Sequence, residues 1–232
     1  MIIEVQHLKK IYGSRTVVDI EHLGIEAGET IGLVGNNGAG KTTFFRMLLN
    51  LIRPDFGLVL SKGMDVSKSD DWKQYTASYL DEGFLIDYLT PEEYFFFIGG
   101  LSGYTKAETL HKLEAFKDFF NGEILKSGKY IRDFSKGNQN KVGIAAALLQ
   151  QPEILVLDEP FANLDPTTQI RLKNLLKEWS SKGLTSLISS HDLNHVTEVC
   201  QRIILLEKGQ VIRSIETNEG TLEELKGYFG ED

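Results

Sequence analysis

A glycine-rich segment early in the chain carries residue types that bind phosphate. Residues 35–42 read Gly-Asn-Asn-Gly-Ala-Gly-Lys-Thr, which fits the eight-residue phosphate-loop pattern. Glycines let backbone N–H groups curl around a phosphate, Lys41 adds a positive charge for the β and γ oxygens, and the Thr42 hydroxyl can ligate Mg²⁺. The alternative, a flexible glycine turn, fits poorly between the strand and the helix predicted on either side. We therefore expect the nucleotide phosphates to be bound by Asn37, Gly38, Ala39, Gly40, Lys41, Thr42 and Thr43.

Two adjacent acids follow an apolar run in the second half of the chain. Residues 154–157, Ile-Leu-Val-Leu, precede Asp158 and Glu159. Such a run is typical of a strand buried in a parallel sheet, where the acids would lie beside the phosphate loop. We expect Asp158 to hold Mg²⁺ and Glu159 to polarise a water for attack on the γ-phosphate. Taken alone, the pair could also be solvated acids at a strand end.

A third segment distinguishes among phosphate-loop proteins. Residues 134–139 read Phe-Ser-Lys-Gly-Asn-Gln just before a predicted helical run. With the two motifs above, this segment makes the chain resemble the nucleotide-binding domains of the ATP-binding cassette (ABC) family, over most of its length. In that family a Ser-x-Gly turn at a helix start faces the γ-phosphate bound by the opposing subunit. The resemblance thus implies a signature acting in trans, formed by Ser135, Lys136, Gly137 and Asn138.

The signature departs from the commonest family version, which has glycine and glutamine where this chain has Lys136 and Asn138. Ser135 and Gly137 remain, and they supply the hydroxyl and the close-approaching backbone that the chemistry needs. Ser135 can also be interpreted as an ordinary helix N-cap. We expect a working signature.

The same resemblance assigns further positions. Asn163, Leu164 and Asp165 stand where the family has its dimer-contacting loop. His191 stands where it has a switch histidine, which would bind the γ-phosphate and hold the attacking water with Glu159. The catalytic set is therefore expected to be Glu159, His191 and Lys41, whereas His195 is assigned no chemistry.

Tyr12 matches the family's aromatic residue that stacks on adenine, although a surface or strand tyrosine is the alternative interpretation. Glu82 stands where the family commonly has a glutamine that meets Mg²⁺ and communicates with the membrane partner. A carboxylate also ligates Mg²⁺, so Thr42, Asp158 and Glu82 are the expected metal ligands, with Asp81 as an alternative at the coupling loop. The aromatic run 94–97 either packs internally or forms part of a groove for the partner.

These residues need an α/β scaffold. Apolar runs predict strands at 30–34, 58–61, 77–80, 154–157 and 184–189, an edge strand at 3–5, and a hairpin of 203–206 with 211–214. Periodicity and capping predict helices at 41–50, 105–119, 141–150 and 167–181, with another starting at Thr90. We expect a P-loop NTPase core with a mainly parallel sheet, an N-terminal antiparallel β region and a helical subdomain. Residues 1–232 would form one ABC ATPase domain, with its core at about 1–85 and 151–232 and the helical subdomain at about 86–150.

Composition limits the class of protein. A net charge of −8 argues against broad nucleic-acid binding, and a single cysteine fits a reducing compartment. No apolar stretch approaches the ~20 residues needed to cross a bilayer, and no secretion signal is expected at the N-terminus. Any membrane role therefore needs a partner.

The interpretation is an ATP-hydrolysing subunit of an ABC transporter that requires ATP and Mg²⁺, and the signature variant favours the export type. It would work as a dimer of cassettes beneath a transmembrane permease on a separate chain, in the cytoplasm at the inner face of the membrane. Two rivals are a non-transport ABC ATPase and a P-loop small-molecule kinase. The first usually has two cassettes or coiled-coil insertions, and the second needs an acceptor pocket and phosphate-binding arginines.

Overall fold

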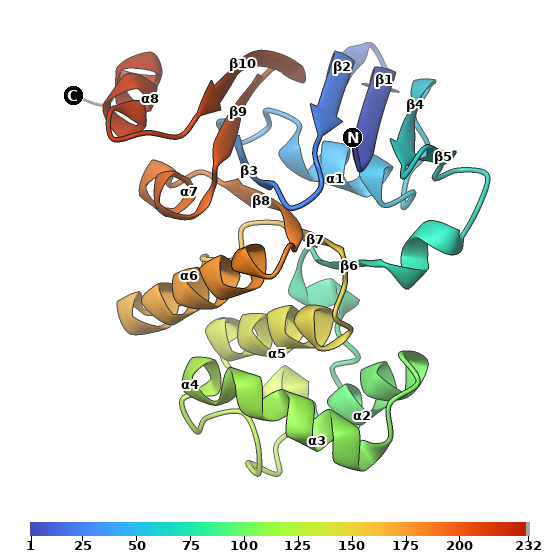
Figure 1. The fold of residues 1–232 in the computed structure, drawn as a ribbon. Helices are drawn as coiled ribbons and strands as arrows, with labels where there is room; N and C mark the ends of the chain where they lie inside the picture. Colours follow the sequence, from blue (N-terminus) through green and yellow to red (C-terminus); the bar gives the residue numbers. More distant parts are fainter. Residues whose placement is uncertain (231–232) are drawn as a thin grey trace.

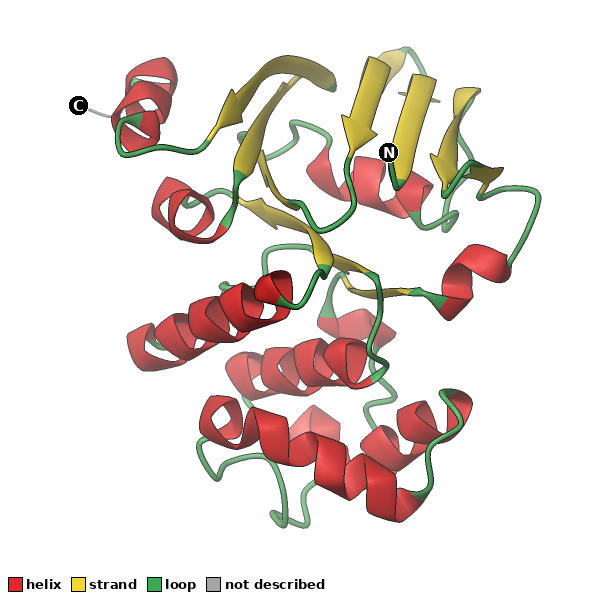
Figure 2. Ribbon diagram, in the orientation of Figure 1, coloured by secondary structure: helices red, strands yellow, loops and turns green. Residues whose placement is uncertain are grey.

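Two β-sheets and a group of helices make up the structure (Figures 1 and 2). The computed structural model describes residues 1–230, apart from the side chain of Glu82. The strands are β1 (Ile3–Tyr12), β2 (Arg15–Ile25), β3 (Thr30–Val34), β4 (Phe56–Ser61), β5 (Met64–Asp65), β6 (Thr76–Tyr79), β7 (Ile154–Leu157), β8 (Thr185–Ser190), β9 (Arg202–Glu207) and β10 (Gln210–Glu216). The α-helices are α1 (Lys41–Leu48), α2 (Pro91–Leu101), α3 (Lys106–Leu113), α4 (Lys117–Phe120), α5 (Lys136–Leu149), α6 (Pro166–Ser181), α7 (Leu193–Val199) and α8 (Thr221–Phe229).

The larger sheet is mainly parallel. Its order is β10-β9-β3-β8-β7-β6, and every neighbouring pair is parallel except β9 with β10. All residues of β3, β7 and β8 are buried, as expected for strands covered on both faces. The smaller sheet, β2-β1-β4-β5, is antiparallel. The predicted fold class is therefore confirmed.

The larger sheet separates two hydrophobic cores. Along β7, Leu155 and Leu157 pack with the helices that include α5, whereas Ile154 and Val156 pack with α1 and the smaller sheet. This division follows from the two-residue period of a strand, which points successive side chains to opposite faces. As a result, α1 and α5 lie on opposite faces of the larger sheet (Figure 1).

The chain between β6 and β7 is helical and contains α2 to α5. Thr90 and Thr105 each form a complete capping box at the start of α2 and α3, an arrangement in which the N-cap is worth about 1 kcal/mol. The predicted start at Thr90 is confirmed, but the helix predicted at 105–119 is divided into α3, a 3₁₀ turn and α4. Within residues 1–230, no helix is both long and apolar enough to span a membrane.

The edge position predicted for residues 3–5 is wrong. β1 lies inside the antiparallel sheet, because β2 pairs along one side of it and β4 along the other. The alternation of apolar and polar residues reports which face of a strand is buried, and it carries no information about how many neighbours the strand has.

Candidate active site

The phosphate loop joins the carboxyl end of β3 to the start of α1. Its last glycine, Gly40, has φ 110°, and a Cβ there would lie 2.6 Å from the Val17 carbonyl oxygen, so both backbone angle and space require glycine. The loop is also held from behind, because Gly209 N–H donates to the Ala39 carbonyl at 2.8 Å and the Gly209 carbonyl accepts from Asp19 N–H at 2.8 Å. Backbone segments from two distant parts of the chain, residues 17–19 and the turn at Gly209, therefore fix the loop.

The phosphate-binding residues differ in exposure. Asn37 and Gly38 are exposed, whereas Ala39 and Gly40 are buried. Thr42 and Thr43 lie in the first turn of α1 and are half-buried. Lys41 is only 7% exposed, and its Nζ donates to the Gly35 carbonyl at 2.6 Å. The Lys41 side chain is thus folded back along the phosphate loop, and its ammonium group contacts the backbone of that loop.

Two of the three predicted metal ligands are in contact. The Thr42 hydroxyl donates to Oδ2 of Asp158 at 2.5 Å, and the Ser189 hydroxyl donates to Oδ1 of the same carboxylate. Burial raises the pKa of Asp158, whereas the hydrogen bonds from Ser189 and Thr42 oppose the shift. Glu82, the third predicted ligand, is a residue whose side chain lies outside the part of the chain that is described.

The paired oxygens of Thr42 and Asp158 fit Mg²⁺, which binds oxygen ligands and is usually held by one or two protein groups together with substrate phosphates. In the described residues there is no group of three or more His, Cys, Asp or Glu that would hold a metal by itself. The alternative residue at the coupling loop, Asp81, accepts from Gly83 N–H at 2.7 Å and lies 3.9 Å from Arg46.

Glu159 contacts both of the other predicted catalytic residues. Its Oε1 lies 3.7 Å from Nζ of Lys41, and its Oε2 lies 2.8 Å from Nδ1 of His191. Its backbone N–H donates to the Ser189 hydroxyl at 2.8 Å, and its φ of 49° is in the left-handed region that non-glycine residues seldom occupy. Such strain costs about 1 kcal/mol or more and requires support from the surroundings, which Ser189 provides.

The signature residues lie together at the start of α5. Ser135 caps the helix by accepting from Asn138 N–H at 3.3 Å, and the exposed Lys136 is its first residue. A Cβ on Gly137 would lie 2.4 Å from the Asn163 carbonyl oxygen, so the signature packs directly against the predicted dimer loop. The capping interpretation of Ser135 and the signature interpretation are therefore compatible.

The dimer loop is fixed at both ends. Asn163 has φ 60°, the Leu164 side chain is buried, and Asp165 caps α6 through hydrogen bonds from the backbone and hydroxyl of Thr168. These bonds lower the pKa of Asp165, the Thr168 hydroxyl having the larger effect.

The structure separates the predicted residues into two groups. Those of the phosphate loop gather with Asp158, Glu159 and His191 at the carboxyl ends of β3, β7 and β8. The signature and Asn163 form the second group at the start of α5, which covers the opposite face of the larger sheet from α1.

Tyr12 ends β1 and is 51% exposed, with Nζ of Lys10 at 5.4 Å from its ring centroid. Its register partner on β2 is Arg15, whose guanidinium approaches Gly38 of the phosphate loop. Arg15 also lines a cavity of about 360 Å³ together with Asn36, Asn37 and Gly38. The turn that carries Tyr12 therefore lies against the phosphate loop.

Sequence reasoning missed two residues of this site, Arg15 and Ser189. Arg15 belongs to no motif, and its only signal is its place three residues after Tyr12. Ser189 stands two residues before His191, in a segment that is predicted only as a parallel strand. His195, to which no chemistry was assigned, lies on α7, where its ring packs on Phe161 with the centroids 4.5 Å apart and burial lowers its pKa.

The fold and the arrangement of these side chains define a P-loop ATPase. The family model described as ABC transporter matches residues 19–162. The chain is 34% identical over 230 residues to the ABC transporter ATP-binding protein YhaQ of Bacillus subtilis, covering 99% of this chain and 74% of the relative. It is also 32% identical to an aliphatic sulfonates import ATP-binding protein of Pseudomonas savastanoi pv. phaseolicola (89% and 73% covered) and 30% identical to the linearmycin resistance ATP-binding protein of Bacillus subtilis (91% and 68% covered).

Among solved structures, an ATP-binding subunit of an ABC transporter matches with a TM-score of 0.83 at 28% identity, covering 100% of this chain and 94% of the other. The chain therefore belongs to the ABC transporter family, as one of its ATP-binding chains, and it is an ATPase.

Proposed function

We propose that this chain powers a membrane transporter by hydrolysing ATP at the site formed by Lys41, Glu159 and His191. The observation that carries the proposal is the double contact of Glu159, whose two carboxylate oxygens reach the phosphate-loop lysine and the histidine separately. A carboxylate held between a phosphate-binding cation and a second proton-carrying group is positioned to act on a water beside the γ-phosphate.

In the proposed reaction, the water oxygen attacks the γ-phosphorus and the bond from that phosphorus to the bridging oxygen of ADP breaks. Glu159 takes the proton of the water, and His191 orients the water and the γ-phosphate. Lys41 leaves its contact with the Gly35 carbonyl to neutralise the β and γ oxygens. Thr42 and Asp158 would hold Mg²⁺, which supplies positive charge to the phosphates when bound.

We further propose that two cassettes close head to tail over two ATP molecules. The phosphate loop precedes α1 and the signature begins α5, and these helices pack on opposite faces of the larger sheet. In the proposed dimer, Ser135 and Gly137 of one copy face the γ-phosphate bound by Lys41 of the other, with Asn163 at the junction. Hydrolysis removes the γ-phosphate contacts and lets the pair reopen.

The membrane partner would dock beside α2. A cavity of about 260 Å³ between the helical region and the sheet is lined by Tyr94 and Ile98 of α2, with Leu51, Trp72 and Phe84 from outside that helix. Leu51, Phe84, Phe97 and Leu101 are large apolar side chains with between 47% and 72% of their surface exposed. An apolar patch that rims a cavity suits the insertion of a helix from another protein. Through this permease the chain would sit at the cytoplasmic face of the membrane.

The predicted division into a core and a helical subdomain at about 86–150, and the export direction, belong to the same proposal. The prediction of export is supported by the signature variant and by the similarity to a resistance protein, whereas the sulfonate relative is named for import. Reconstitution with the permease in inside-out vesicles would decide the direction, because export would load the vesicle lumen and import would empty it.

The catalytic assignment is tested with Glu159→Gln. This variant should bind ATP as wild type does but lose at least about a hundredfold in kcat, because general-base catalysis contributes roughly 10²–10⁴-fold. The control is Glu21→Gln, an equal charge change on an exposed β2 residue, which should keep full activity. Full turnover by Glu159→Gln would refute the assignment.

The dimer is tested by thiol cross-linking in the Glu159→Gln background. Chains carrying Asn37→Cys are mixed with chains carrying Ser135→Cys, and ATP should promote their linkage by a short bis-maleimide. The native thiol of Cys200 should not react with the maleimide, because it is buried and burial raises its pKa. Replacing Ser135→Cys by the exposed control Ser67→Cys should abolish the product; equal linkage with both, or linkage with neither, would refute head-to-tail closure.

A further inference from the structure

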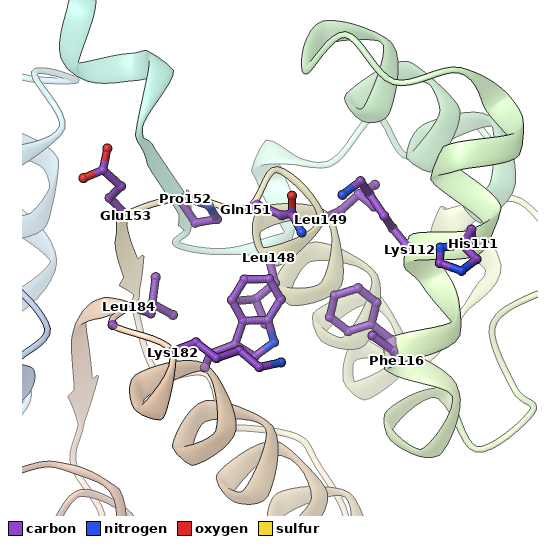
Figure 3. A pocket seen from close by; sticks show the side chains of 13 residues that line it. His111, Lys112, Phe116, Leu148, Leu149, Gln151, Pro152, Glu153, Lys182 and Leu184 are labelled. Atoms are coloured by element: carbon purple, nitrogen blue, oxygen red, sulfur yellow. The ribbon is translucent and has the colours of Figure 1, made fainter.

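A third cavity lies at the end of the larger sheet opposite to the phosphate loop. It has a volume of about 530 Å³, within the ~300–1,000 Å³ range of small-molecule sites, and lies between α3, the end of α5 and the end of α6 (Figure 3). Its wall includes the loop Gln151–Glu153 before β7 and Leu184 before β8. The nucleotide site follows those same two strands, so the cavity is separated from it by their length.

The interior of the cavity is apolar. Phe116 comes from the 3₁₀ turn after α3, Leu148 and Leu149 from the end of α5, and Leu184 from the segment before β8. These four side chains are buried, whereas Trp179 of α6, which also lines the cavity, is only partly buried. An apolar floor with a partly buried indole suits a flat or branched hydrocarbon body.

The rim of the cavity carries basic side chains. His111 and Lys112 come from α3, and Lys182 comes from the opposite wall beyond α6 (Figure 3). Nζ of Lys112 lies 4.4 Å from the ring centroid of Tyr104, and Nζ of Lys182 lies 2.6 Å from Glu178 and 5.7 Å from the Trp179 ring centroid. Both ammonium groups are thus held near the cavity.

The acidic group in the lining is already neutralised. Glu153 accepts from Lys62 at 2.7 Å through both carboxylate oxygens, and Lys62 lies outside the lining. Lys182 is paired in the same way with Glu178 at 2.6 Å, so Lys112 is the charged group of the lining that has no carboxylate within 4.0 Å among the described residues, in a chain whose net charge is −8. A local positive site in an acidic protein selects anions, because the remaining surface repels them.

We propose that this cavity binds a small amphipathic organic anion: a planar or branched apolar body that packs on Trp179 and the leucines, with one carboxylate, sulfonate or phosphate group bound by Lys112 and by Lys182, which it would share with Glu178. The site is independent of ATP, since it is built at the amino ends of β7 and β8 and shares no residue with the catalytic group. An occupant would bridge α3 to α6 across the boundary between the helical region and the sheet.

The test uses the intact chain and 8-anilino-1-naphthalenesulfonate, an aromatic sulfonate whose emission rises on apolar binding. We expect saturable binding at one site per chain. The double variant Lys112→Glu/Lys182→Glu should raise the Kd at least about tenfold, whereas Lys106→Glu/Lys177→Glu, the same charge change on exposed residues of α3 and α6 outside the lining, should leave it within about twofold. N-phenyl-1-naphthylamine, which has the same rings and no charge, should bind wild type at least about tenfold more weakly.

Two further measurements separate this site from the nucleotide site and from folding effects. Saturating ATP with Mg²⁺ should leave the sulfonate bound, and Ala115→Trp, which fills the cavity without changing its charge, should abolish binding while circular dichroism shows a native fold. Equal affinity for the charged and uncharged probes, displacement by ATP, or unchanged binding in both the charge-reversed and the filled variants would overturn the proposal. None of these results alters the tests of Glu159, so the two proposals can fail separately.

Discussion

Ser189 joins the two acids of the catalytic site, and its removal gives the sharpest test of how that site is held. The hydroxyl donates to Asp158 and accepts from the backbone N–H of Glu159, and the side chain is fully buried. Ser189→Ala would remove one hydrogen bond to a carboxylate and leave one buried N–H without its acceptor. Ser186→Ala is the matched control on the same strand, because the Ser186 hydroxyl is equally buried and has no hydrogen-bond partner among the described residues.

The expected magnitude follows from these contacts. A hydrogen bond to a charged group contributes about 1.5–3 kcal/mol, and a buried group left unpaired costs about 1–3 kcal/mol. We therefore expect Ser189→Ala to lose about 3 kcal/mol of stability, which lowers Tm by roughly 6–12 °C in a chain of this size. Ser186→Ala should be neutral or slightly stabilising, since it removes a hydroxyl that was buried at a cost.

Activity should follow the same contacts. The Ser189 bond favours the ionised form of Asp158, so its loss should raise the pKa of that carboxyl above its already raised value. At a given pH a smaller fraction of Asp158 is then ionised in the nucleotide-free protein, and the acidic limb of the kcat/KM profile, which reports that state, should move to higher pH. Thermal unfolding and ATPase activity between about pH 5 and 9 measure both effects; equal Tm values for the two serine variants, or an unmoved acidic limb, would refute this reasoning.

Three other outcomes are expected. Asp158→Asn should abolish Mg²⁺-dependent turnover but raise Tm at pH 7.5 without nucleotide, by about 2–4 °C for each kcal/mol gained, because burial opposes ionisation of the native carboxyl. This gain in Tm should shrink as the pH falls toward about 4 and the native carboxyl takes up its proton, and a gain that does not depend on pH would contradict the cause. Gly137→Ala should lower the free energy of unfolding in urea by about 1–3 kcal/mol, since its Cβ would lie 2.4 Å from the Asn163 carbonyl oxygen. Gly227→Ala on α8, where a Cβ would have no atom within 4 Å, should not lower it, and similar losses in both variants would contradict the packing explanation. Tyr12→Ala should raise the Kd for a fluorescent ATP analogue by about 5- to 100-fold with Tm unchanged, and Tyr12→Phe should bind as wild type does, because stacking needs the ring rather than the hydroxyl.

Features specified by neighbouring residues could be predicted from the sequence. The phosphate loop is recognisable because its glycines, lysine and threonine are consecutive, and the start of α2 because Thr90 and Glu93 form their capping box within one turn. β7 was predicted with the bounds that it has, since a strand buried on both faces needs an uninterrupted apolar run. The proximity of Glu159 to His191 came from the resemblance to the family rather than from spacing.

Features decided by distant parts of the chain were beyond this reasoning. β2 had no prediction, because its polar residues interrupt the alternation and its strand character depends on pairing with β1. Ser189 looks like any small residue in a strand until Asp158 and Glu159 are placed beside it by the parallel pairing of β7 with β8. The position of the Arg15 guanidinium beside Gly38 likewise depends on how the turn before Arg15 folds over the phosphate loop.

The central strand β3 receives its neighbours late in synthesis. It pairs with β8 and β9, and the turn at Gly209 that holds the phosphate loop follows them, so the loop emerges from the ribosome long before anything that fixes it. A nascent chain that ends before Gly209 contains all the residues of the phosphate loop but lacks the turn that holds this loop in place. Prematurely terminated products should therefore be inert toward ATP and open to proteolysis, so an interrupted translation does not release a subunit that consumes ATP without a transporter to drive.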